Sequence, residues 1–337
     1  MDHIKILKRA WETTWRYRAL WVFGIILALT AGGVRGSGPQ ATFGGGNGNG
    51  DGNFPPPGDF YVPEISAQIV GVLIALGVAL ACVAVFLIIA ATIARYVAET
   101  ALIRLVDDHE ETGEQRSVRE GFRMGWSRTA FRLFLIKLLT GLPVALAFIP
   151  LFLLALAPLL LWMTESRVAG AVGTVATIGL FFLFVFLAII VGMVLSLLMH
   201  FFRRACALEE VGVIEAIRQG YGIVRRHQKD LVVMWLIMVG LGLGWIIVMI
   251  PVTILLVLVG AVLGGFPALL IGGLASLVFE GAAPWILAGV VGFPIFILVV
   301  AASALFLGGL MEVFKSSVWT LTYRELRVLE DVWPEGT

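Results

Sequence analysis

Charged side chains are scarce in this sequence. Lysine, arginine, aspartate and glutamate together make up 14% of its 337 residues, whereas soluble domains average about 25%. Hydrophobic residues make up 59% and the mean hydropathy is +0.97, which excludes a water-soluble globular protein. The net charge is only +1, so the chain has no overall electrostatic attraction for nucleic acid and we expect no such partner.

Residues that bind metals, form disulfides or carry out catalysis are also few. The two cysteines, Cys82 and Cys206, lie on separate segments and make neither a disulfide framework nor a metal cluster. The four histidines do not pair at a metal-ligand spacing, and a zinc site needs three or four ligands. The apolar segments contain no serine–histidine–acid set and almost no charge. We therefore expect no metal, no cofactor, no catalytic residue, no enzyme activity and no proton-coupled transport.

Long apolar segments are what the sequence has in abundance. A helix that crosses a membrane needs about 20 apolar residues. Six segments are candidates, at residues 19–34, 65–94, 133–163, 169–202, 231–263 and 286–314. We therefore predict an all-α fold, a polytopic transmembrane helical bundle with six spans that forms a single membrane domain over residues 1–337.

Two regions between or within these segments allow more than one interpretation. The first segment could be a signal peptide, but it lacks a clean cleavage site and belongs to the repeat described below, which favours a span. Residues 264–285 contain one charge, Glu280, and could be interfacial, re-entrant or a seventh span. Residues 35–64 are rich in glycine, asparagine and proline, which predicts a flexible extracytoplasmic loop.

Basic residues fall almost entirely on one side of the expected spans. Of the 24 lysines and arginines, 21 lie either before the first span or after the second, fourth or sixth span. The opposite segments contain only Arg35 and Arg167, and Lys137 lies near an end of the third span. Because lysine and arginine are retained in the cytoplasm, we predict that both termini are cytoplasmic. A seventh span would move the C-terminal basic residues outside.

A five-residue pattern recurs before the first, third and fifth spans. It reads apolar, basic, any, small, aromatic, and occurs as LKRAW at 7–11, FRMGW at 122–126 and IRQGY at 217–221. The apolar spacing around each copy predicts an amphipathic helix, and such a helix beside a span lies naturally in the membrane interface. The residues that we expect to contact lipid or a partner are Lys8, Trp11, Arg123, Trp126, Arg218 and Tyr221.

The recurrence predicts three parallel repeats, each an interfacial helix followed by a transmembrane hairpin. Their boundaries are 1–95, 96–203 and 204–314, and residues 315–337 would form a cytoplasmic C-terminal tail. Gly240, Gly242, Gly244 and the pairs at 32–33 and 308–309 are expected to pack helices closely in lipid. The acidic run at 107–111 is expected to be a solvated loop.

Three stretches carry a resemblance to a known group of proteins: KRAWE at 8–12, EAIRQGY at 215–221 and SVWTLTYREL at 317–326. With them the chain resembles poorly characterised bacterial membrane proteins, which are similar to the membrane domain that precedes the catalytic barrel in some glycerophosphodiester phosphodiesterases. The resemblance implies a bacterial inner-membrane protein. It implies no phosphodiesterase activity, because the chain has no room for the barrel and no catalytic residue can be matched.

These observations favour a non-enzymatic function. We expect an inner-membrane scaffold, accessory protein or regulator of a lipid-linked process, with membrane lipids, including anionic head groups, as partners. A protein partner or a second copy of the chain could also bind. One alternative is a transporter of a lipid or small uncharged solute, and another is an accessory subunit of a larger membrane complex.

Overall fold

Every secondary-structure element that the structure describes is a helix. The computed structural model describes residues 1–30, 67–163 and 166–332, and within these ranges no strand occurs. The prediction of an all-α protein is confirmed. The helices are α1 (His3–Arg16), α2 (Ala19–Thr30), α3 (Ala67–Thr112), α4 (Val118–Gly125), α5 (Arg128–Leu156), the 3-10 helix η1 (Ala157–Met163), α6 (Arg167–Leu208), α7 (Val213–Arg226), α8 (Gln228–Ala275) and α9 (Ala283–Val332).

Five of these helices are long and apolar enough to cross a membrane, so the protein is a multi-pass membrane protein. They are α3, α5 with η1, α6, α8 and α9. The first expected span is described only in part: α2 has 12 residues, a length of about 18 Å, and residues 31–34 of that span lie outside the described residues. The expected extracytoplasmic loop at 35–64 lies outside them as well.

The long helices extend beyond the segments that their apolar residues predict. Residues 264–285 contain the outer end of α8, the turn after Ala275 and the start of α9 at Ala283, so they form the tip of a hairpin and not a separate span. Residues 315–332, expected to belong to a tail, continue α9 without a break. Charged residues in that stretch end the apolar run of α9. Several of its side chains are nevertheless buried in the protein: Val318 and Leu326 are fully buried and Trp319 is nearly so.

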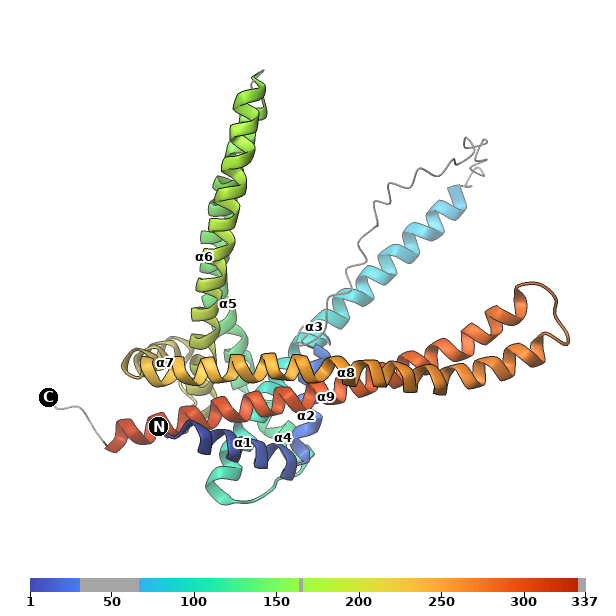
Figure 1. Ribbon diagram of the computed structural model, residues 1–337. Coiled ribbons are helices and arrows are strands. Elements are labelled where there is room, and N and C mark those ends of the chain that lie inside the picture. The colour runs from blue at the N-terminus through green and yellow to red at the C-terminus, as the bar shows by residue number, and fades with distance from the viewer. Residues whose placement is uncertain (31–66, 164–165, 333–337) are drawn as a thin grey trace.

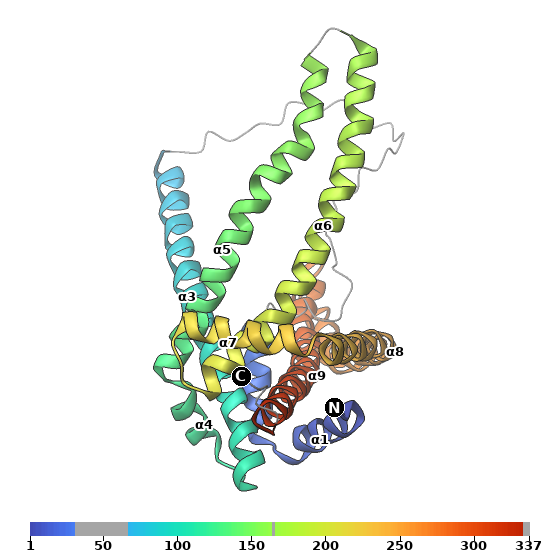
Figure 2. The same ribbon diagram turned by 90° about the vertical axis from the view of Figure 1, so that its left-hand side faces the viewer.

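The buried core lies at one end of the molecule, in a region that we call the hub. It contains α1, α4, α7, the N-terminal ends of α2, α5 and α8, and the C-terminal ends of α3, α6 and α9. The C-terminal ends of α3, α6 and α9 contact one another there. Long apolar arms lead away from the hub in different directions (Figures 1 and 2), and α1 packs on α9, so the first and last described helices meet.

The arms have little protein packing around them. Side chains at 71–72 and 74–90 of α3 are exposed on every side of the helix, which suits a segment surrounded by hydrocarbon. The α8–α9 arm is the most closely packed, because its two helices touch backbone to backbone where Gly264 faces Gly292. A Cβ atom on Gly264 would lie 2.6 Å from the carbonyl oxygen of Gly292.

The expected role of the glycines is right for α9 and wrong for α8. Gly309 of α9 crosses α2 in direct contact with Gly24 and Ile25, so small residues here do permit close approach. Among the described residues, Gly240, Gly242 and Gly244 have, in contrast, no neighbour within 4 Å of an added Cβ atom. Met238 and Met249 on either side of them are buried, so the glycines lie on sides of α8 that no other described residue covers closely, a fact that the sequence pattern does not reveal. The expected glycine pair at 32–33 lies outside the described residues.

Candidate functional site

The three five-residue patterns lie on three short amphipathic helices of the hub, α1, α4 and α7. Each is joined to the next, apolar helix by at most two residues, which fixes the short helix against the base of an arm. α1 packs on α9, α4 on α3 and α7 on α6. Every amphipathic helix is thus held on the C-terminal end of one of the three helices that meet in the hub.

The small residue of each pattern makes this packing possible. Ala10 is completely buried, and Gly125 and Gly220 are buried as well. A Cβ atom on Gly125 would lie 2.9 Å from that of Ala101 on α3, and one on Gly220 would lie 2.7 Å from the ring of Phe202 on α6. The small position is therefore the contact point with the long helix, and a larger side chain there would push the two helices apart.

The basic and aromatic residues of the patterns point away from the hub. Lys8, Arg123 and Arg218 are exposed, and the aromatic side chains are 52%, 72% and 53% exposed at Trp11, Trp126 and Tyr221. Exposed tryptophan or tyrosine beside an exposed cation is typical of a helix at a membrane interface. The six residues belong to helices that pack on three different long helices, so they form three separate patches and not one site.

Aromatic rings link one of these patches to the first arm. Trp11 packs edge-to-face on Trp15 and on Phe314, with ring centroids 5.7 and 6.0 Å apart. Trp15 packs in turn on Trp21 of α2, whose ring also meets Phe306 of α9. The indole N–H of Trp21 donates to the carbonyl oxygen of Thr14 at 2.7 Å. Such a row of aromatic rings is suited to the boundary between head groups and acyl chains.

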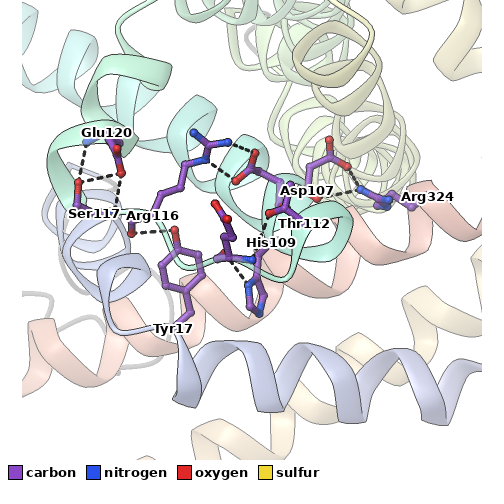
Figure 3. Close-up of polar contacts among 10 residues, drawn as sticks. Tyr17, Asp107, His109, Thr112, Arg116, Ser117, Glu120 and Arg324 are labelled. Atoms are coloured by element: carbon purple, nitrogen blue, oxygen red, sulfur yellow. Dashed lines mark hydrogen bonds and ion pairs between the residues drawn. The ribbon is translucent and has the colours of Figure 1, made fainter.

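The acidic run at 107–111 is not a solvated loop, and that prediction is wrong. It is the last part of α3, and three arginines pair with it, two of which, Arg116 and Arg324, are labelled in Figure 3. Arg116 makes a two-pronged contact with Asp108 at 2.5 and 2.7 Å. Arg324 of α9 bonds Asp107, and Arg9 of α1 pairs with Glu110. Arg116 lies eight residues after Asp108, but Arg9 and Arg324 are far from the run in sequence, so only the fold brings these two to it.

The connection between α3 and α4 is held in a fixed shape by the same cluster (Figure 3). The buried Tyr17 hydroxyl donates to the carbonyl oxygen of Arg116 at 3.0 Å, and burial raises the pKa of that phenol. Ser117 then caps α4: its backbone N–H donates to Glu120 at 2.9 Å, and the Glu120 N–H donates back to the Ser117 hydroxyl. The Ser117 backbone N–H and hydroxyl both donate to the Glu120 carboxylate, and these two bonds hold the pKa of that carboxyl below its ordinary value.

Replacing the cap should loosen α4 without disturbing the arms. Ser117→Ala removes the acceptor for the Glu120 N–H, and losing such a cap costs about 1 kcal/mol. We expect faster hydrogen exchange in the first turn of α4, measured by mass spectrometry on the detergent-solubilised protein. Exchange in α7, which has no side-chain cap, provides the control and should stay unchanged. Unaltered exchange in α4 would contradict a role for the capping box.

Arg104 is a structural residue that the sequence analysis does not single out. From α3 its guanidinium donates to the carbonyl oxygens of Ala207 and Met124, at 3.2 and 3.4 Å, and to the hydroxyl of Thr129 at 2.9 Å. It also pairs with Glu210 at 2.7 Å. This one side chain thus bonds to four other helices or connections of the hub. The only signal in the sequence for this role is that an arginine lies within a segment flanked by apolar residues.

The residues described contain no group of three or more metal-ligating side chains, and the six predicted site residues form no catalytic cluster. Fold and surface together define a multi-pass helical membrane protein with a polar hub at the base of its spanning helices. The chain belongs to a family of unknown function, DUF7544, which it matches over residues 2–335. No curated protein and no solved structure matches it significantly.

Proposed function

We propose that the protein is a non-enzymatic inner-membrane scaffold or regulator that holds its hub against the cytoplasmic head groups of the bilayer. The observation that carries this proposal is the set of three exposed basic–aromatic pairs around one hub. Buried small residues fix each pair at the base of an apolar arm. Cations placed at that depth attract anionic lipids, and rings beside them are suited to the interface.

The same proposal includes six spans in three parallel repeats with both termini in the cytoplasm. Its support is the order of the helices, because a short amphipathic helix followed by two apolar helices occurs three times. Further support is the packing, in which α4 and α7 lie on the last helix of the preceding set and α1 lies on the last helix of the chain. Most lysines and arginines lie in the hub, which favours a cytoplasmic location for it.

Neutralising the three patches together tests the proposal. The triple variant Lys8→Gln, Arg123→Gln, Arg218→Gln should fold normally, since all three side chains are exposed. Each cation near an anionic surface contributes about 1 kcal/mol, so we expect the enrichment of phosphatidylglycerol over neutral lipid around the protein to fall severalfold. The measurement is mass spectrometry of lipids that co-purify in polymer-bounded membrane discs.

A charge-conserving variant, Lys8→Arg, Arg123→Lys, Arg218→Lys, is the matched control and should retain the wild-type enrichment. If the neutral variant co-purifies the same lipids as the wild type, the interfacial patches have no role in lipid association. If the neutral variant instead loses a co-purifying protein while its lipids stay unchanged, the patches bind a protein partner.

The exposed arms support a second candidate, an accessory subunit of a larger membrane complex. The most apolar stretch of α3 has none of its residues buried, so another protein's helices could cover it in place of lipid. Purification under mild conditions distinguishes the two functions. A stoichiometric membrane-protein partner would favour the accessory subunit, and a single species with bound lipid would favour the scaffold.

A further inference from the structure

A cavity of about 370 Å³ lies at the point where the arms enter the hub, and none of the three surface patches is part of it. Helices α2, α3, α6, α8 and α9 all contribute to its lining. Ligand-binding pockets commonly have volumes of about 300–1,000 Å³. Its charged lining residues are Arg95, Glu99, Arg203, Arg204, Glu312 and Lys315.

The positive charges of this cavity are only partly neutralised. Arg203 pairs with Glu99 at 2.5 Å, and Lys315 pairs with Glu312 at 3.3 Å. Both acidic residues of the lining are used in these two pairs. Arg95 and Arg204 have no carboxylate partner within the part of the chain that the structure describes, which leaves two uncompensated cations facing one cavity.

Arg204 is the more unusual of the two, because it is only 3% exposed. Its guanidinium donates to the carbonyl oxygens of His200 and Ser316, at 2.8 and 3.0 Å. Its Nε atom is buried and has no partner among the described residues. Carbonyl groups do not cancel a full charge, and a buried arginine with an open donor is the arrangement that binds a phosphate or a carboxylate well.

Most of the rest of the lining is apolar, apart from Ser196, His200 and Ser316. Leu27, Trp235, Met238, Val239 and Trp319 contribute to it. On α3, exposed arm residues precede the cavity and buried hub residues begin immediately after Arg95. A ligand in this cavity would therefore meet both uncompensated cations and apolar side chains where the arms join the hub, which suits a phospholipid near its head group.

We propose that the cavity binds one phosphate-bearing lipid, with its phosphate on Arg95 and Arg204 and its acyl chain along Trp235 and Met238. The phosphate supplies the negative charge that the lining lacks beside Arg95 and Arg204. Only the depth of the cavity in the bilayer rests on the proposed function. The charge deficit and the buried donor do not depend on it.

Native mass spectrometry of the full chain in detergent tests this site. We expect the wild type to retain one anionic phospholipid and the variants Arg95→Gln and Arg204→Gln to retain it at least tenfold less. Arg119→Gln removes an exposed arginine of α4 and should retain the lipid fully. Should Arg204→Gln fail to fold, Arg95→Gln provides the test, because its side chain is only partly buried.

Added ligands identify the source of the phosphate. Phosphatidylglycerol should raise the unfolding temperature of the wild type more than phosphatidylcholine does, and millimolar inorganic phosphate alone should have little effect. Equal stabilisation by inorganic phosphate would overturn the lipid and point to a soluble phosphate ligand. Equal retention of lipid in the wild type, Arg95→Gln and Arg204→Gln would overturn the site itself. The triple variant of the surface patches should keep this lipid, so the two proposals can fail separately.

Discussion

Gly309→Ala is expected to destabilise the protein although alanine favours a helix more than glycine does. The added Cβ atom would lie 2.8 Å from the backbone nitrogen of Ile25 and 3.0 Å from the carbonyl carbon of Gly24. Both atoms belong to the backbone of α2, so no side-chain rotation relieves the contact. Overpacking of this kind costs about 1–3 kcal/mol. The better helix propensity of alanine offsets about 1 kcal/mol of that cost, so over most of the range the substitution destabilises the protein.

The neighbouring glycine is a matched control for this substitution. An added Cβ atom on Gly308 would lie 3.7 Å from that of Ala28, an ordinary van der Waals distance. Gly308→Ala should therefore be neutral or slightly stabilising, while Gly309→Ala lowers the unfolding temperature measured by tryptophan fluorescence in detergent. Equal behaviour of the two variants would show that α2 does not cross α9 at Gly309.

Arg104→Gln is expected to have a comparable or larger effect, because Arg104 connects α3 to α4, α5, α6 and the segment at Glu210. Hydrogen bonds to a charged group contribute about 1.5–3 kcal/mol each, but Glu210 is 71% exposed and its pair with Arg104 is therefore largely screened. The bonds to Ala207, Met124 and Thr129 carry most of the effect. We expect a loss of roughly 2–4 kcal/mol in the free energy of unfolding.

The measurement for Arg104→Gln is denaturant unfolding in detergent, followed by the fluorescence of tryptophans in and near the hub. Arg119→Gln is the control, since Arg119 is exposed and a substitution there should change stability by less than about 0.5 kcal/mol. If Arg104→Gln unfolds at the same denaturant concentration as Arg119→Gln, the bonds of Arg104 do not hold the hub together.

The helices and the three recurring patterns could be predicted from the sequence because their signals are local. A run of apolar residues favours a helix in lipid wherever it occurs. The alternation of basic, small and aromatic residues at 7–11, 122–126 and 217–221 defines the faces of a helix without any knowledge of its neighbours. The exposure of Trp11, Trp126 and Tyr221 follows from that periodicity, and the structure agrees with it.

Errors arose where a residue's environment depends on distant parts of the chain. The acidic run at 107–111 has the composition of a solvated loop, yet Arg324, a partner 217 residues away from Asp107, pairs with it in the hub. Gly240 and Gly309 both suggest helix packing, but among the described residues Gly309 has the backbone of α2 against it and Gly240 has nothing within 4 Å of an added Cβ atom. Composition describes a residue's own preferences and does not state which other residues will satisfy them.

The sequence by itself determined that this protein is helical and built for a membrane, because hydrocarbon excludes charge and leaves backbone groups only each other to bond. It also determined which side chains of the short helices face outward. Only the tertiary structure decided that the charged ends of α3, α6 and α9 form one buried hub and that Arg95 and Arg204 face the same cavity. Contacts between residues more than a hundred positions apart depend on how the helices pack in three dimensions, and no local pattern specifies that packing.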